Sequence, residues 1–370
     1  MAIDWPQLDR TPPGSSEAWE CTQAGEVLRR DWFTPNHGPA LKRHTGTGWE
    51  LRALKHWDGV AHVHYGVLKR WDSGEWVETP TILTPPTPYV APPPAPSITI
   101  PLDGYTTGLW GAYSLRRRLR TGYSGPILQA RRSSDNAVMD IGLVGNYLDT
   151  NTLYAFLDNS QGFLTTIYDQ SGAGNHFTQA TATAQPKLSM GTPTKAYISF
   201  DGAGDIMQSP VFGSGASGAT IFFSGNMPTT GDQALLESSA NYNANSNTLL
   251  VYYAVAEGGF NVATHGVSSN YARSSFGDVR PSNNVHAYRI DRNAAAFIDK
   301  TSLFVDGIKQ TRTGNADTGS ISGGFSPNTL YWACRSGGAL TSQLDAHDLC
   351  IYASALSDVD IAAVSTRLVG

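Results

Sequence analysis

Charged residues are scarce in this chain of 370 residues, where Asp, Glu, Lys and Arg make up only 15%, against about 25% in typical soluble proteins. The formal net charge of −5 leaves no broad basic surface for nucleic acid. Three cysteines, Cys21, Cys334 and Cys350, cannot build a disulfide framework and fit a reducing compartment. No apolar run approaches about 18 residues, which excludes a membrane-spanning helix.

The first residues, MAIDWPQLDR, lack a basic segment followed by an apolar one. We therefore expect no Sec signal peptide, and we expect synthesis in a cytoplasm.

Glycine and proline are abundant, with 38 and 21 copies. They accompany short β-type runs, such as ATIFFSGNM, TLLVYYAVA and VHAYRIDR, which recur from residue 195 onward with turn residues between them. This spacing is typical of an all-β sandwich. We expect short helices at Ala112–Leu119, at Thr150–Leu157 behind Asp149 as cap, and after Ser357 to about Leu368. The four arginines of the first helix, Arg116, Arg117, Arg118 and Arg120, are expected to be solvated or paired with acids of the same domain.

A proline tract divides the chain. Residues 80–96 hold eight of the 21 prolines, which favours an extended, semi-rigid spacer. Residues 1–79 hold seven of the nine tryptophans, whereas the segment after the tract is rich in Gly, Ser, Thr and Asn. We predict an N-terminal domain at 1–79, a linker at 80–98 and a β-sandwich domain at 99–370.

The N-terminal domain contains a short repeat, seen in KHWDG at 55–59 and KRWDSG at 69–74. Asp-Gly and Asp-Ser-Gly tolerate the positive φ of hairpin turns, so each unit is expected to be a strand, a turn and a returning strand. Hairpins this small are not stable alone. We therefore expect residues 1–79 to associate with further copies of the chain.

His62 and His64 share one face of an expected strand, because side chains alternate along a strand. The alternatives are a structural pair and an axial metal site between copies of the chain. With no further ligand in the sequence, we expect no metal and no cofactor.

Two strings carry a resemblance to known proteins. They are GAYSLRRRLRTGYSGPILQARRSSDNAVMDIG, at 111–142, and TTIYDQSGAGNHFTQA, at 165–180. Followed by the strand series, they resemble the catalytic domain of α-L-arabinofuranosidases with a concanavalin-like fold. They are also similar to structural proteins of tailed bacteriophages that end in a laminin-G-like domain. The resemblance implies a mainly β fold: a concanavalin-like, laminin-G-like jelly-roll sandwich with a few short helices.

The glycosidase resemblance also implies where catalytic carboxylates should lie. The position of the nucleophile falls at Asn241, with Glu237 four residues earlier, and no pair of adjacent cysteines precedes it. The loop of the acid/base residue corresponds to residues 335–340, with Ala339 where the family has an aspartate. Because an amide and a methyl group cannot replace the two carboxylates, the interpretation is that the chain is not an enzyme. The nearby acids Asp169, Asp201, Asp205 and Glu237 are expected to be loop and turn residues. The alternative is that Glu237 is the nucleophile, displaced from Asn241 by an insertion or deletion.

The Trp-Asp-Gly repeat resembles segments of phage tail-tip and fibre proteins. The hypothesis is therefore a virion protein of a tailed phage, a homotrimer bound to other tail proteins through residues 1–79. Its sandwich would recognise a glycan on the host surface, without contact to nucleic acid or insertion into a membrane. The alternatives are an arabinofuranosidase-like glycoside hydrolase and a decoration protein that binds no sugar.

A sugar site needs an aromatic face and converging polar groups. The sequence predicts such a site from Asp169, Gln170 and Asn175 in the polar loop together with Asn241 and Tyr242. The alternative is that the loop residues bind their own backbone, as Asx residues often do in turns.

Overall fold

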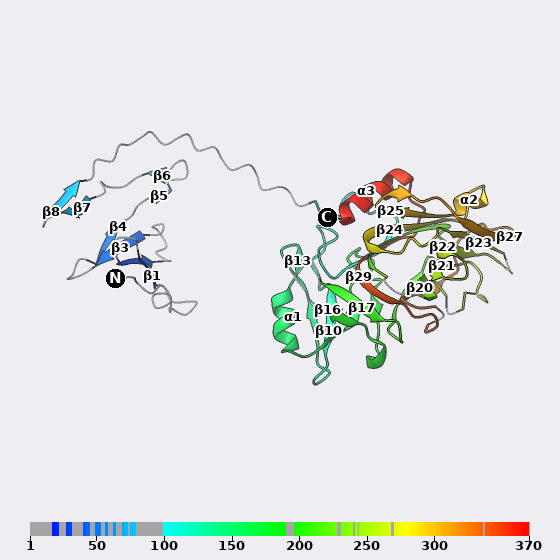
Figure 1. The fold of residues 1–370 in the computed structure, drawn as a ribbon, viewed down its shortest axis with the longest axis horizontal. Coiled ribbons are helices and arrows are strands. Elements are labelled where there is room, and N and C mark those ends of the chain that lie inside the picture. The colour runs from blue at the N-terminus through cyan, green and yellow to red at the C-terminus, as the bar shows by residue number, and fades with distance from the viewer. Residues whose placement is uncertain are drawn as a thin grey trace. The chain divides into compact units, whose positions relative to one another are not determined.

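The computed structural model divides the chain into two compact units, Met1–Ala95 and Pro96–Gly370. It describes the backbone of eight strands before residue 98, and then residues 99–189, 196–227, 231–239, 241–242, 244–267, 270–335 and 337–369. Figure 1 shows the two units as separate ribbons.

Antiparallel strands pair in sequence order in the first unit. One sheet contains β1 (Glu17–Cys21), β2 (Val27–Asp31), β3 (Ala40–His44) and β4 (Trp49–Arg52). Two further hairpins consist of β5 (His56–Trp57) with β6 (His62–Val63), and of β7 (Lys69–Asp72) with β8 (Glu75–Glu78). These two pairings fall on the repeat units at 55–59 and 69–74. The predictions on the tryptophan, His62 and His64 side chains and on the linker lie outside the described residues.

The second unit is an antiparallel sandwich, so the predicted mainly β fold is confirmed (Figure 1). In its first layer the strands follow the order β9, β29, β19, β24, β25 and β26. Their bounds are Leu109–Ser114, Gln343–Tyr352, Gly218–Asn226, Ser282–Asp291, Thr301–Val305 and Ile308–Lys309. The central strand β19 is buried at almost every residue, because both faces of this layer are covered.

The second layer follows the order β18, β28, β20, β21, β22, β23 and β27. Its strands span Met207–Phe212, Asn328–Trp332, Gln233–Glu237, Thr248–Ala254, Gly259–His265, Tyr271–Ser275 and Gly314–Thr318. One face of β20–β23 packs on the core, and the other carries a smaller apolar cluster of Ala234, Tyr242, Leu250 and Ala263.

Shorter elements complete the sandwich. The strands are β10 (Leu128–Arg132), β11 (Val138–Ile141), β12 (Leu143–Val144), β13 (Tyr147–Leu148), β14 (Gly162–Ile167), β15 (Phe177–Thr178), β16 (Lys187–Ser189) and β17 (Tyr197–Asp201). The helices are α1 (Thr150–Leu157), the 3₁₀ turn η2 (Ala182–Ala184), α2 (Phe297–Lys300) and α3 (Asp358–Val369). Through β17, which pairs with both β16 and β29, this group joins the first layer.

The main core lies between the two layers, where Tyr113, Phe223 and Tyr288 of the first layer share one apolar cluster with Phe260 and Trp332 of the second. A second cluster lies on the outer face of the first layer, under Ile361, Val364 and Leu368 of α3. Their i, i+3, i+7 spacing gives α3 one apolar face. In the described residues, no helix is both long and apolar enough to cross a membrane.

Two predicted helices are confirmed and one is wrong. Asp149 caps α1 by accepting a hydrogen bond from the Thr152 N–H at 3.0 Å, and α3 follows the predicted cap. The segment from Ala112, however, begins within β9. The residues of β9 pair with those of β29, which lies far away in the sequence. The fully buried side chains of Ala112 and Tyr113 face opposite clusters, as the period of a strand requires.

Candidate functional site

Asp169, in the loop predicted to bind sugar, is turned into the fold. Its side chain is 2% exposed, and Oδ1 accepts hydrogen bonds from the N–H groups of Ala112 at 2.9 Å and Ser171 at 2.7 Å. Asp201 and Asp205 also serve turns, since Asp205 accepts a hydrogen bond from the Asp201 N–H at 3.0 Å. Their burial and contacts assign these carboxylates to the fold, in agreement with the expected loop and turn roles.

Gln170 and Asn175 fasten the same loop to the segment that carries β9. Gln170 is 1% exposed, and its Oε1 accepts a hydrogen bond from the Leu119 N–H at 2.7 Å. Asn175 donates from Nδ2 to the Trp110 carbonyl at 2.7 Å. We call residues 169–176 the clasp, because this loop joins two distant parts of the chain by side chain to backbone bonds. These bonds match the alternative in which the polar residues bind nearby backbone.

Tyr242 is the predicted site residue that lines a pocket. The pocket lies on the outer face of β20–β23 and has a volume of about 310 Å³. Its lining consists of Asp232, Tyr242, Leu250, Tyr252, Ala254, Glu257, His265, Tyr271, Arg273, Arg335 and Leu340. We call it the outer-face pocket. Asn241, the other predicted residue of this segment, is exposed and accepts a hydrogen bond from the Ala244 N–H at 3.3 Å.

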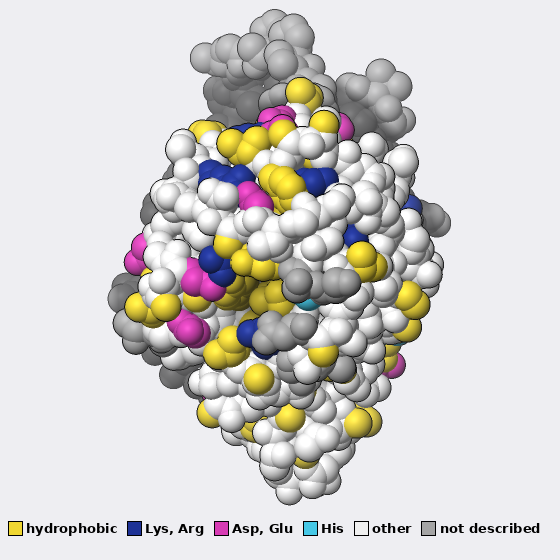
Figure 2. Space-filling model, turned by 90° about the vertical axis from the view of Figure 1, so that its right-hand side faces the viewer, with side chains coloured by type: hydrophobic (Ala, Val, Ile, Leu, Met, Phe, Trp, Pro, Cys, Tyr) yellow, Lys and Arg dark blue, Asp and Glu magenta, His cyan; other side chains and the backbone are white. Residues whose placement is uncertain are grey.

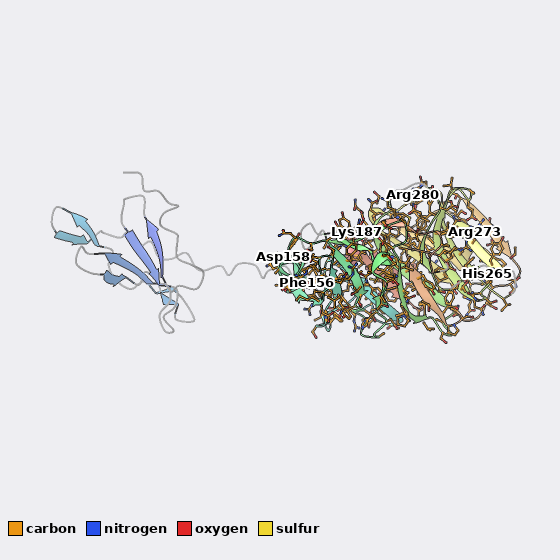
Figure 3. The ribbon with its side chains drawn as sticks, turned by 90° about the horizontal axis from the view of Figure 1, so that it is seen from below. Phe156, Asp158, Lys187, His265, Arg273 and Arg280 are labelled. Carbon is orange, nitrogen blue, oxygen red and sulfur yellow. The ribbon has the colours of Figure 1, made fainter. Side chains whose placement is uncertain are left out.

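Figure 2 views this end of the domain and shows a hollow with an apolar floor, where basic and acidic side chains meet at one rim. His265 and Arg273 lie at this end in Figure 3. The hollow exists because β20–β23 carry small or apolar residues on their outer face, Leu250 and Ala263 among them, while longer polar side chains stand around it.

One wall of the pocket is aromatic. The ring centroid of His265 lies 5.1 Å from that of Tyr242 and 6.4 Å from that of Tyr271, to which it is nearly parallel at 13°. Burial raises the pKa of Tyr242 well above its usual value, so the phenol stays neutral. Such a wall offers flat faces on which the CH groups of a sugar can stack.

The opposite wall is charged. Arg273 donates from Nη1 to Glu257 and, at 3.3 Å, to the Tyr252 hydroxyl, which itself donates to Glu257. Burial and the Glu257 carboxylate raise the pKa of Tyr252, which therefore remains a hydrogen-bond donor. Asp232 adds a second carboxylate to the rim and accepts a hydrogen bond from the Val255 N–H at 2.8 Å. This bond ties Asp232 to the turn that carries Glu257.

A third carboxylate lies beneath the pocket. The register of the strands aligns Glu237, Leu250, Ala263 and Arg273 in one row across β20–β23, and residues paired in this way point to the same face. Glu237 is 0% exposed. Its Oε1 accepts a hydrogen bond from the Ser239 hydroxyl at 2.7 Å, and its Oε2 lies 3.9 Å from Arg335 Nε.

The loop after β28 closes one side of the pocket. Arg335 and Ala339 form a tight bridge in which each N–H donates to the other's carbonyl at 2.6 Å. This turn aims the Arg335 guanidinium over the Tyr242 ring, 5.6 Å from its centroid, and brings Leu340 to the lining. The loop predicted to border the site therefore does border it, with Ala339 in place of a carboxylate.

Arg292, at the end of β24, holds the pocket's aromatic wall in place from behind. Its buried guanidinium donates to the His265 carbonyl at 2.7 Å, to the Thr264 hydroxyl at 2.8 Å and to Asn247 Oδ1 at 2.6 Å. Burial lowers the pKa of Arg292 to about 10, which still leaves it charged at neutral pH.

Sequence reasoning missed the residues on the charged wall. Glu257, Arg273 and Arg335 come from three separate segments, and no spacing in the sequence brings them together. The pairing of β21, β22 and β23 and the pairing of β20 with β28 do so. The resulting pocket combines carboxylates, guanidinium groups and aromatic faces, which suits recognition of hydroxyl-rich ligands and acid–base chemistry on them. In the described residues, no group of three His, Cys, Asp or Glu side chains is placed to hold a metal ion.

Comparison with known proteins places much of this unit near one family. Residues 102–261 match the family described as "Alpha-L-arabinofuranosidase B, catalytic". The probable α-L-arabinofuranosidase B of Aspergillus fumigatus is 41% identical over 85 residues, which are 22% of this chain and 17% of that protein. The α-L-arabinofuranosidase B of Penicillium canescens is 31% identical over 166 residues, 43% of this chain and 32% of that protein. The aligned parts thus span a third or less of these relatives.

A solved structure shares the fold. It is an arabinofuranosidase complexed with arabinofuranosyl-α-1,2-xylobiose, with a TM-score of 0.51 at 14% identity. The similarity covers 73% of this chain and 65% of that one.

These comparisons overturn the phage interpretation of the sequence. The match to a catalytic family contradicts the predicted virion protein, its role in receptor binding without enzymatic activity, its partnership with tail proteins as a homotrimer, and its location in a virion. The error has a physical origin. The Trp-Asp-Gly repeat that suggested a tail protein is hairpin-turn chemistry, which any small β unit can use.

Proposed function

We propose that the chain is a glycoside hydrolase that releases arabinofuranosyl groups, and that the outer-face pocket is its active site. One observation carries the proposal: two carboxylates, Asp232 and Glu257, line a pocket with an aromatic wall, and a third, Glu237, lies buried beneath it. All three belong to the segment that matches the catalytic family. The relatives' names supply the substrate class, and one structural neighbour binds an arabinofuranosyl group on a xylobiose.

Glu237 is the proposed nucleophile. It lies in the row of residues that crosses the pocket floor, and its Oε2 lies 3.9 Å from Arg335 Nε. Its carboxylate is buried, so residues around it have to move before a sugar can reach it. In a retaining reaction this carboxylate attacks the anomeric carbon as the glycosidic C–O bond breaks, and water then hydrolyses the glycosyl ester.

A second carboxylate has to protonate the departing oxygen and later deprotonate the water. The pocket rim offers Asp232 and Glu257. Glu257 accepts hydrogen bonds from Arg273 and Tyr252 at the rim, which suits it to bind sugar hydroxyl groups. Asp232, whose partner is a backbone N–H, is not paired with a cation by any contact the structure describes, and it is the proposed acid/base residue.

Hydrolysis of 4-nitrophenyl α-L-arabinofuranoside by the full chain tests the proposal. We expect turnover by the unmodified protein and a loss of more than about 10²-fold in kcat for Glu237→Gln, because the amide cannot form the covalent intermediate. Asp299→Asn, on the exposed surface of α2, is the matched control and should retain the full rate. Absence of turnover on aryl arabinofuranosides and on arabinoxylan, or full activity in Glu237→Gln, would contradict the proposal.

A comparison of leaving groups tests the assignment of Asp232 as the acid/base residue separately. Asp232→Asn should slow release of alkyl leaving groups far more than release of 4-nitrophenolate, which departs without a proton. Glu257→Gln should instead raise KM for both substrates. Equal effects of Asp232→Asn on the two leaving groups would remove Asp232 from this role and leave the hydrolase proposal intact.

A further inference from the structure

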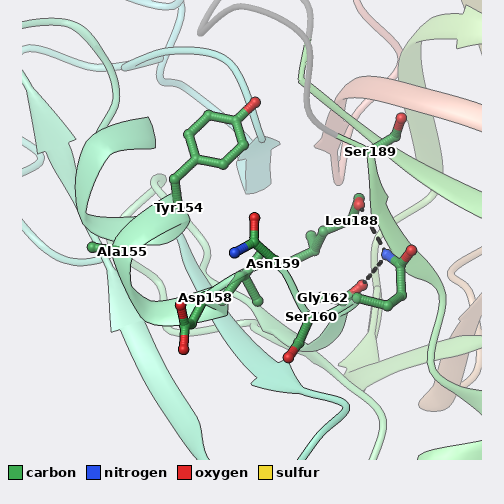
Figure 4. Close-up of a pocket in the computed structure, with 10 residues that line it drawn as sticks. Tyr154, Ala155, Asp158, Asn159, Ser160, Gly162, Leu188 and Ser189 are labelled. Carbon is green, nitrogen blue, oxygen red and sulfur yellow. Dashed lines mark hydrogen bonds between the residues drawn. The ribbon is translucent and has the colours of Figure 1, made fainter.

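A second pocket opens beside α1, apart from the outer-face pocket. Its volume is about 500 Å³, and Figure 4 shows it between the end of α1 and the strands β14 and β16. The lining consists of Tyr154, Ala155, Leu157, Asp158, Asn159, Ser160, Gln161, Gly162, Leu188 and Ser189. We call it the α1 pocket.

The backbone around the α1 pocket is held in an uncommon conformation. Asp158 and Asn159 have φ values of 45° and 62°, which are sparsely populated by residues other than glycine. The Asp158 N–H donates to the Tyr154 carbonyl at 3.1 Å, and the Ser160 N–H donates to the Leu157 carbonyl at 2.8 Å. These bonds end the helix abruptly and turn two polar side chains outward in succession.

The floor beneath the turn is closely packed. A Cβ atom at Gly162 would lie 3.0 Å from both Cδ atoms of Leu157 and 3.4 Å from Leu188. Gln161 is fixed as well, because its Nε2 donates to the carbonyls of Gly162 at 2.9 Å and Leu188 at 3.3 Å, as the dashed lines in Figure 4 show. The pocket is therefore preformed, with a rigid floor and a polar rim.

The rim provides the two elements of sugar recognition. The Tyr154 side chain is 48% exposed and offers a ring face at one side of the pocket. Figure 4 shows the Asn159 amide on the same side of the turn as this ring. Within the part of the chain that the structure describes, neither Asn159 nor Asp158 uses its side chain in a hydrogen bond, so both remain available to a ligand.

The charge of the α1 pocket narrows the ligand class. Asp158 is the charged residue of the lining, and the lining contains no Lys or Arg. The nearby Arg132 lies outside the lining and is already paired with Asp135 and the Phe156 carbonyl. A phosphate, sulfate or uronic acid would therefore meet the Asp158 carboxylate without a cation in the lining to bind it. An uncharged sugar instead gains from the same groups, because its hydroxyls donate to the carboxylate and accept from the amide while its CH face stacks on Tyr154.

We infer that the α1 pocket binds a sugar residue of a neutral polysaccharide, as a second attachment point distinct from the proposed active site. In Figure 3, Phe156 and Asp158 lie at one end of the domain, and His265 and Arg273 lie at the other. A polysaccharide chain bound at the α1 pocket stays at a high effective concentration near the outer-face pocket of the same domain. The inference concerns binding and does not depend on turnover.

Affinity electrophoresis of the full chain in gels that contain soluble arabinoxylan tests this site. All proteins carry Glu237→Gln, so that the polymer stays intact. Tyr154→Ala and Asn159→Ala should each weaken retardation at least fivefold. Tyr147→Ala removes another exposed tyrosine, from β13 outside the pocket, and should bind like the parent; Tyr154→Phe keeps the ring and should also bind.

Melting temperatures separate a folding defect from a binding defect. The inference is overturned if the parent is not retarded by arabinoxylan or linear arabinan, or if Tyr154→Ala and Tyr147→Ala are retarded equally. Because the assay detects binding, its result is independent of whether aryl arabinofuranosides are hydrolysed. A third outcome also overturns the inference. If Tyr271→Ala abolishes retardation and Tyr154→Ala leaves it unchanged, all polysaccharide binding occurs in the outer-face pocket.

Discussion

Arg335 and Glu237 form an ion pair of unequal exposure, with Nε and Oε2 separated by 3.9 Å. The Arg335 side chain is 23% exposed and Glu237 is fully buried. Glu237 belongs to β20, whereas Arg335 lies in the loop after β28, so the pair connects the pocket floor to its edge. A buried carboxylate is tolerated only while its charge is compensated.

Arg335→Met should therefore destabilise the domain through Glu237. We expect the free energy of unfolding to fall by about 1–3 kcal/mol, less than for a fully buried pair because water reaches Arg335. Glu237→Gln removes the uncompensated charge, so the double variant should recover most of that loss. Urea denaturation of the parent, the two single variants and the double variant gives the coupling free energy between Arg335 and Glu237. Strictly additive effects would contradict the predicted coupling.

Asp348 should make the domain sensitive to strong acid. Arg116 and Arg117 both contact its buried carboxylate. Burial alone would raise the pKa of Asp348, but the two guanidinium groups outweigh it and hold the pKa below its usual range. The unfolded chain therefore binds a proton that the folded chain does not, and stability falls as the pH drops below about 4. Asp348→Asn should cost about 3–5 kcal/mol at pH 7 and flatten this dependence in urea titrations.

His286 should make the stability of the domain depend on pH in a higher pH range than Asp348 does. It lies inside the sandwich near Phe260 and Tyr288, and neither ring nitrogen has a hydrogen-bond partner among the residues that the structure describes. Burial lowers its pKa to about 4. Because the unfolded histidine has a pKa near 6.5, stability should decrease by roughly 3 kcal/mol between about pH 6.5 and 4. In His286→Leu the stability loss between pH 6.5 and 4 should become smaller by this amount, while His347 and Asp205, whose pKa values are also shifted, still contribute. An unchanged pH dependence would contradict the prediction.

Gly259 is expected to be indispensable for the turn that carries Glu257. Its φ is 138°, and a Cβ atom there would lie 1.9 Å from the Gly277 carbonyl oxygen. Gly259→Ala should cost roughly 2–4 kcal/mol, since the backbone itself has to move. The control is Gly258→Ala, where φ is 76° and the added atom meets nothing within 4 Å, so only about 1 kcal/mol of backbone strain is expected. Equal melting temperatures of the two variants would contradict the prediction.

The sequence predicted what is determined locally. The runs that became β19, β21 and β24 carry β-branched and aromatic residues between turns, and Asp149 marks the start of α1 by its capping side chain. The expected helix at Ala112 was wrong because its conformation is set by β29, far away in the chain. Local propensity cannot anticipate a pairing partner of that kind.

The candidate site could be predicted only in part. Tyr242 lies in the pocket as expected, and the loop of Ala339 borders it. No sequence motif marks Glu257 or Arg273, because single charged residues are common on strands and turns. Only the strand register, which the sequence alone does not reveal, brings the two side chains together. The clasp shows the converse: Asp169 and Gln170 form a conspicuous motif whose hydrogen bonds serve the fold.

The position of β29 in the sheet has a consequence for how the protein is made. This last strand inserts between β9, the first strand of the domain, and β19, its most buried strand. On a ribosome, β9 and one edge of β19 therefore stay unpaired until β29 (Gln343–Tyr352) has been synthesised. Closure of such distant contacts is slow, and open apolar edges promote aggregation meanwhile. We therefore expect a chain that stops just before β29 to be insoluble, even though it contains every residue that lines the outer-face pocket.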